Sequence, residues 1–297
     1  MKFKPFVSLL LVTALAFFNS ITPANASNTK DVNTLLGSNF CPFCDLSGSD
    51  LSRHNLKKSD ISFSDLSFVD LSQSNLNSAD LSQSDLSFAI LKNADLGNAN
   101  LGSSNLSNAD LSNASLFKVN LGNAVLTNAN FTGANLRQAK LSGLSPAIAS
   151  GSNFKGADLQ GANLEGVSFV KADLSEVDLS NDANLKDAKL DGSLIQKSIL
   201  IGANLEKAHL SNADLSNSDL SYVNLKKAVL DQAKLTDSNL QGANLKNAIL
   251  RNATLKNANL SGADLSDADL IGANLAGANL NGTILTGTVM PDGKSHE

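Results

Sequence analysis

The chain has 297 residues and a formal net charge of −5, with acidic and basic residues spread along its whole length. A mildly acidic chain without a basic block is a poor ligand for nucleic acid phosphates, so we expect no nucleic acid partner. The chain has two cysteines and three histidines. Because the histidines are scattered along the sequence, these residues cannot supply the four ligands of a zinc site. We therefore expect no metal site, and we also expect no cofactor.

The first 26 residues have the organisation of an export signal. Two lysines precede an apolar run over residues 6–18, which is shorter than the roughly 20 residues of a membrane span. Ala24, Ala26 and Ser27 have the small side chains of a cleavage site. We therefore expect residues 1–26 to be removed, which changes the formal charge from −5 to −7, and no stable membrane insertion after cleavage.

Residues 27–44 are expected to cap the N-terminal end of the repeats that follow. The residues from Asp31 to Leu36 predict a short helix, which Gly37 ends. Leu35, Leu36 and Phe40 are expected to lie over the apolar core of the first repeats.

Cys41 and Cys44 would meet an oxidising compartment after export, so we expect a disulfide between them. Their C-x-x-C spacing also occurs in redox proteins, but a thioredoxin-type site needs a βαβ unit that the sequence does not predict. Both cysteines fall on inward positions of the repeat described next, which favours a structural clamp over a redox site.

A five-residue repeat covers residues 45–143 and 153–290. Its unit is a small residue, Asp or Asn, Leu and two polar residues, as in Ala79-Asp80-Leu81 and Ala203-Asn204-Leu205. A period of five fits neither the 3.6 of a helix nor the 2 of a strand, so the chain must turn by a fixed angle in every unit. If four units close one square coil, residues twenty apart stack at the roughly 4.8 Å spacing of paired strands, in about 12 coils.

This pattern resembles the pentapeptide repeat family over about residues 45–290, with consecutive matches such as those from Leu240 to Leu245. The resemblance implies an all-β fold, a right-handed quadrilateral β-helix with the leucine and the small residue inside, here preceded by the short helical cap. The ends resemble those of exported cyanobacterial members, on Leu35-Leu36, on Cys41 to Leu46 and on Met290 to Gly293.

Two interruptions break the repeat. Leu141 and Phe154 are 13 residues apart, which is not a multiple of five, and Pro146 lies between them. We expect residues 144–152 to form a loop that leaves the rod, either a tolerated insertion or a recognition loop. An extra residue near Asn181 is expected to be a bulge, and residues 291–297 a C-terminal tail, because Pro291 cannot donate a strand hydrogen bond.

Apolar residues at positions that should face water form a candidate interaction patch. Phe68 and Phe88 are twenty residues apart and should stack on one corner of the rod. Three further members replace the usual Asp or Asn before the leucine. Aligned exposed apolar groups indicate a contact surface. The candidate patch comprises Phe63, Phe68, Phe88, Ile90, Val229 and Ile249.

The sequence shows no Ser/His/Asp set, no phosphate-binding glycine loop and no glycine-rich calcium repeat, so we expect no enzyme activity. We expect an exported structural or protein-interaction rod in the periplasm or thylakoid lumen, or secreted, with an unknown protein partner or self-association. Two alternatives stay open. The first is a DNA-mimicking inhibitor of topoisomerase or gyrase, which the resemblance implies for some cytoplasmic members of the family. The second is a redox-active C-x-x-C module.

Overall fold

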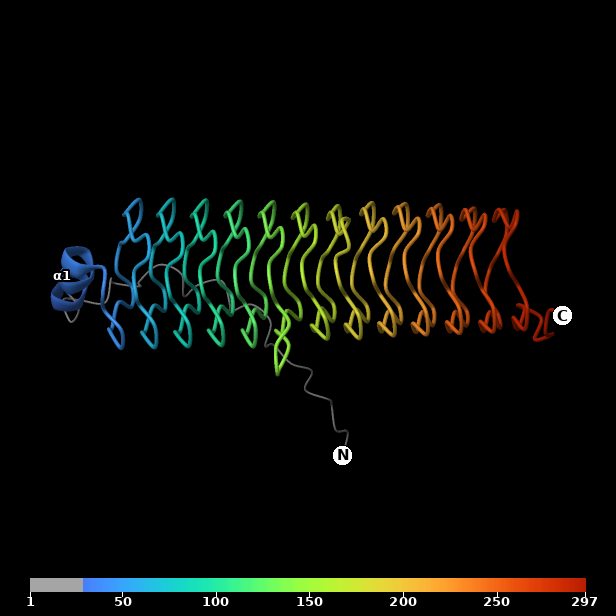
Figure 1. Cartoon of the computed structure of the whole chain (residues 1–297), viewed down its shortest axis with the longest axis horizontal. Helices are drawn as coiled ribbons and strands as arrows, with labels where there is room; N and C mark the ends of the chain where they lie inside the picture. Colours follow the sequence, from blue (N-terminus) through green and yellow to red (C-terminus); the bar gives the residue numbers. More distant parts are fainter. Residues whose placement is uncertain (1–28) are drawn as a thin grey trace, which may run out of the picture.

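The computed structural model describes residues 29–297, in which α1 (Thr29–Ser38) is the single helix. Helix α1 lies at one end of a straight rod of stacked coils, and the C-terminus lies at the other end (Figure 1). The expected export signal, with Ala24, Ala26 and Ser27 at its cleavage site, lies outside the described residues. The rod confirms the right-handed quadrilateral β-helix that the resemblance to the pentapeptide repeat family implies.

Each five-residue unit makes one side and one corner of a coil. The central leucine and the small residue two positions before it point inward and are buried through most of the rod, as for Leu81 and Ala79. They are only partly buried at its C-terminal end, as for Leu275 and Leu280. The N–H of the next unit's small residue donates to the central residue's carbonyl, as Ala79 does to Leu76 at 2.9 Å. The second residue after the leucine has a positive φ, near 60°, as Ser78 has between those two. This left-handed residue turns the chain at every corner.

The coils are joined by parallel backbone pairing between the residues that precede the leucines. Pairs are twenty residues apart in most of the rod, and each coil therefore contributes to four columns, which define four faces. Face 1 begins at Phe40, face 2 at Asp45, face 3 at Asp50 and face 4 at Asn55. Faces 1 and 2 each contain thirteen paired residues, so the expected number of about 12 coils is confirmed.

The Asp and Asn residues of these columns stabilise the corners. Their side-chain oxygens accept a hydrogen bond from the backbone N–H two residues later, as Asp80 does from Ser82 at 2.9 Å. Asparagines also bond to each other between coils, as Asn224 does to Asn204 at 3.0 Å. These hydrogen bonds give the Asp and Asn columns a structural role.

Three phenylalanines replace leucine where the front part meets the rear part. Phe131 stacks on Phe154 with ring centroids 4.5 Å apart, and Phe169 meets Phe154 edge to face at 5.4 Å. All three side chains are fully buried. They fill the core beside the interruption of the repeat.

The interruption is shorter than the loop expected at residues 144–152. Ile148 pairs with Val125 on one side and Ser168 on the other, and Ala147 and Ala149 are buried in the core. The pairing distance there is 23 residues instead of 20, so only three residues are in excess, and they project from a corner around Leu144. The expected loop of residues 144–152 is too long, because Ala149 replaces the central leucine of a unit and the repeat is therefore not recognisable there from the sequence.

The N-terminal cap also differs in detail from the expectation. Leu35 is fully buried against the first coil, but Leu36 and Phe40 are 42% and 58% exposed. Adjacent helical residues point about 100° apart, so only one of the two leucines can face the rod. The left-handed residue that ends α1 is Asn39, whose N–H donates to Leu35, and not Gly37.

Candidate protein-interaction surface

The candidate surface is the front part of face 2, where the column consists of Asp45, Asp65 and Asp85. The corner between faces 1 and 2 precedes this column, and the corner between faces 2 and 3 follows it. Both corners have phenylalanine at the left-handed position. We call this surface the aromatic-acidic face; it comprises Phe43, Phe63, Phe68, Phe88, Asp45, Asp65 and Asp85.

The phenylalanines form two stacks, one on each side of the acidic column. Phe43 and Phe63 have ring centroids 4.9 Å apart, and Phe68 and Phe88 have centroids 5.0 Å apart. The rings of both stacks are nearly parallel, at 15° and 3°. The four side chains remain between 45% and 75% exposed, so stacking covers one ring face while leaving others open to a partner.

The carboxylates between these stacks are held in fixed positions. Asp65 and Asp85 each accept a backbone hydrogen bond at 2.9 Å, from Ser67 and Ser87. Both carboxylates are exposed, and among residues 29–297 neither forms an ion pair. The surface therefore presents oriented negative charge between two aromatic rows.

The remaining residues of the predicted patch lie in two separate parts of the rod. Ile90 lies on face 3, directly beyond the Phe68–Phe88 stack, and is 42% exposed. Val229 and Ile249 pair with each other and are half-buried. They lie on face 2, but in its rear part, eight coils after Asp65. The predicted patch thus divides into a front and a rear surface on face 2, and Ile90 lies on the adjoining face 3.

Sequence reasoning missed Phe43. It lies twenty residues before Phe63 and stacks on it, but its place between the two cysteines drew attention to the disulfide. The twenty-residue spacing that identified Phe68 and Phe88 would also have identified this pair.

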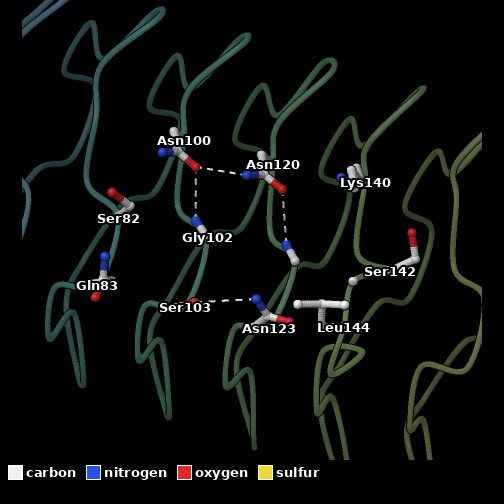
Figure 2. A pocket seen from close by; sticks show the side chains of 12 residues that line it. Ser82, Gln83, Asn100, Gly102, Ser103, Asn120, Asn123, Lys140, Ser142 and Leu144 are labelled. Atoms are coloured by element: carbon white, nitrogen blue, oxygen red, sulfur yellow. Dashed lines mark hydrogen bonds between the residues drawn. The ribbon is translucent and has the colours of Figure 1, made fainter.

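A polar cleft of about 380 Å³ lies beside the projecting corner at Leu144 (Figure 2). Asn120 donates to Asn100 across two coils at 2.8 Å, and these amide oxygens also accept from glycine N–H groups. Lys140 is the one charged residue in the cleft lining, which has no carboxylate, histidine or cysteine. Lys140 forms no side-chain hydrogen bond with a serine of this lining, so no serine there is paired with a base.

Further along face 2, Asp269 pairs with Arg251, whose Nε donates to Asp269 Oδ2 at 2.7 Å. Burial raises the pKa of Asp269, but the N–H of Ile271 and the guanidinium of Arg251 outweigh it, and the pKa falls below its ordinary value. The Asp269 carboxylate therefore stays ionised, but the adjacent Arg251 compensates its charge, so little net negative charge is left for a partner.

Cys41 and Cys44 form a disulfide with their Cα atoms 5.6 Å apart, as expected. Cys41 is buried at a leucine position, and Cys44 is packed against the core at a small-residue position. A buried sulfur is poorly accessible to a substrate thiol, so the arrangement supports a clamp on the first coil. Within residues 29–297, no cluster of three or more His, Cys, Asp or Glu could bind a metal ion.

Reduction of this disulfide is expected to lower the stability of the first coil by roughly 2 kcal/mol, because the closed loop is short. Thermal unfolding with and without reductant measures the shift. The double variant Cys41→Ser/Cys44→Ser is the control, and its melting temperature should not respond to reductant. Rapid labelling of free thiols in the exported protein would contradict the clamp.

The stacked coils, the buried leucine core and the four exposed faces define a solenoid protein. Family models described as pentapeptide repeats match residues 43–77, 64–102, 104–143, 150–181 and 248–287, and a model described as a pentapeptide repeat region matches residues 196–265. The chain belongs to the pentapeptide repeat family. No curated protein matches the chain. No helix within residues 29–297 has the length and apolar character that crossing a membrane requires.

Solved structures of the same family are similar to this chain. HetL of Nostoc sp. strain PCC 7120, described as involved in heterocyst differentiation regulation, is 29% identical, with 91% of this chain and 100% of that chain covered and a TM-score of 0.28. Rfr23 of Cyanothece 51142 is 42% identical over 32% of this chain and 64% of its own, with a TM-score of 0.30. AT2G44920 of the Arabidopsis thaliana thylakoid lumen is 24% identical over 44% and 70% of the two chains, with a TM-score of 0.20.

Proposed function

We propose that the chain is a non-enzymatic protein-interaction scaffold that is exported to the periplasm or thylakoid lumen and binds protein through the aromatic-acidic face. The observation that carries the proposal is the pair of exposed phenylalanine stacks on either side of an acidic column. A contiguous exposed aromatic surface is typical of protein contact sites.

The backbone supports this interpretation. Phe43, Phe63, Phe68 and Phe88 have φ values between 57° and 60°, a left-handed conformation that bulky side chains rarely adopt. Because their rings are exposed, they add little to the core, and glycine or asparagine would suit the same corner better. Phenylalanine at these four corners is therefore better explained by contact with a partner than by folding.

The location rests on the N-terminal sequence and on the cysteine pair, which suits an oxidising compartment. The two alternative functions receive less support. A DNA mimic needs continuous negative charge, but the rear part of face 2 presents lysines, among them Lys189, Lys207 and Lys227. A redox module needs an accessible thiol, but Cys41 is buried in a disulfide.

Photo-cross-linking in the native compartment tests the proposal. A photoreactive phenylalanine analogue at Phe68 should form a discrete cross-linked species, because this position contacts bound protein. The matched control is the same analogue at Tyr222, which is 64% exposed and left-handed but lies between faces 4 and 1. Equal or absent cross-linking at the two positions would refute a specific role for the aromatic-acidic face.

A further inference from the structure

The rear part of face 2 has the opposite charge to the front part. We compare coils of this face together with its two corners. The front coils contain three aspartates and no lysine or arginine, a net charge of −3. The rear coils contain six lysines and one arginine against three aspartates and one glutamate, a net charge of +3, or +2 without Arg251, whose charge Asp269 compensates. The front coils comprise residues 42–48, 62–68 and 82–88, and the rear coils comprise residues 186–192, 206–212, 226–232 and 246–252.

The rear lysines lie around the apolar residues Val229 and Ile249. Lys207, Lys227 and Lys246 are exposed at the corner between faces 1 and 2, and within residues 29–297 none of them forms an ion pair. This is the corner that has Phe43 and Phe63 in the front part. Face 2 thus has an aromatic, acidic front part and a basic, aliphatic rear part.

The middle of face 2 is apolar. Ile148 is the sixth residue of the column and is 48% exposed, and Val125 precedes it. Leu144 is fully exposed on the corner of the same coil. An apolar centre between two oppositely charged ends is a self-complementary pattern.

From this pattern we propose that two copies of the chain bind each other in antiparallel orientation through face 2, around a two-fold axis near Ile148. This inference rests on the proposed function, because it identifies the protein that occupies the aromatic-acidic face as a second copy. A two-fold axis that lies in the interface, perpendicular to the rod, makes the second copy run in the opposite direction. The same axis brings each corner of face 2 against the equivalent corner of the second copy. It places the coil of Asp65 against that of Val229, and the coil of Asp85 against that of His209.

In this register the exposed aspartates of the front column meet coils that contain unpaired lysines. Asp65 faces the coil that contains Lys227 of the second copy, and Asp85 faces the coil that contains Lys207. Phe63 lies on the same corner as Lys227 and can accept its ammonium group over the ring. The projecting Leu144 side chains of the two copies meet beside the axis and are covered.

The size of the surface is sufficient for a stable contact. The eleven coils from Asp45 to Ile249 span about 48 Å at the spacing of paired strands. The three extended residues of a side span roughly 10 Å, and the side chains of the two flanking corners widen the contact. Face-to-face packing therefore buries at least about 1,000 Å² in total, which reaches the size of specific interfaces.

Sedimentation velocity of the purified chain tests the proposal. At low ionic strength the chain should sediment as a dimer, and 1 M salt should shift it toward the monomer because screening weakens the charge pairs. The front variant Asp65→Lys/Asp85→Lys and the rear variant Lys207→Glu/Lys227→Glu should each lower the association constant at least tenfold.

Mixing these two variants is the decisive experiment. Each variant alone brings like charges together at both ends of the interface, whereas a mixed dimer restores opposite charges at both ends. An equimolar mixture should therefore dimerise. The control variant Asp80→Lys/Asp95→Lys makes the same charge change on faces 1 and 4 and removes equivalent corner hydrogen bonds, as at Asp80 and Asp85. It should dimerise like the unchanged chain.

A chain that is monomeric at all salt concentrations, or a mixture of variants that stays monomeric, would overturn the inference. Equal loss of dimer in the control variant would overturn it as well. These results leave the scaffold proposal intact if Phe68 still cross-links to a different protein, so the two failures can be told apart.

Discussion

Replacing Phe154 by alanine is expected to lower the free energy of unfolding by about 3–5 kcal/mol. Its ring stacks on Phe131, meets the edge of Phe169 and is fully buried. The backbone pairing on both sides fixes the spacing of the coils, so the walls of the cavity cannot collapse inward. Urea unfolding followed by circular dichroism measures the loss as a lower midpoint.

Phe88→Ala is the matched control for this measurement. Its ring also stacks on another phenylalanine, Phe68, but is 49% exposed, so we expect a loss below about 1 kcal/mol. Equal shifts of the two midpoints would show that the internal cluster is not a core feature.

Leu35→Asp is expected to open the N-terminal end of the rod. The side chain of Leu35 is fully buried between α1 and the first coil, where an unpaired carboxylate costs several kcal/mol. The same end is also held by Asp31, whose Oδ2 accepts a hydrogen bond from the N–H of Asp45 at 3.1 Å. Loss of the helix exposes both the leucines and the backbone edge of the first coil.

Hydrogen exchange resolved by segment measures this effect. Protection should be lost in the first coils and recover along the rod, because each coil contacts only its neighbours. Leu36→Asp is the control, since Leu36 is adjacent in the helix but 42% exposed, and it should leave the pattern unchanged. Uniform loss of protection along the rod would contradict a nearest-neighbour solenoid.

The repeating turn was predictable because a leucine at every fifth residue fits neither a helix nor a simple strand, and the right-handed β-helix followed from the resemblance to the pentapeptide repeat family. The stacking of Phe68 on Phe88 followed directly from their twenty-residue spacing and is confirmed. The extent of the interruption was not predictable, because Ala149 at a leucine position and Pro146 nearby both resemble loop residues.

That error also hid the relation between the two predicted apolar groups. Asp65 and Val229 are 164 residues apart, which is not a multiple of twenty. Only the pairing shows that three extra residues lie near Leu144 and one near Asn181, and that the two positions are eight whole coils apart on one face. Counting along the sequence alone would place them on different faces.

Because four units complete one coil, the number of residues between two surfaces determines the angle between them around the rod axis. A duplication or deletion of twenty residues moves the rear surface along the rod by one coil, roughly 4.8 Å, and keeps it on face 2. A change of five residues instead rotates everything downstream by a quarter turn. The excess residues at Leu144 and Asn181 are accommodated in corners, so they change the residue count and leave the rotational phase of the rod intact.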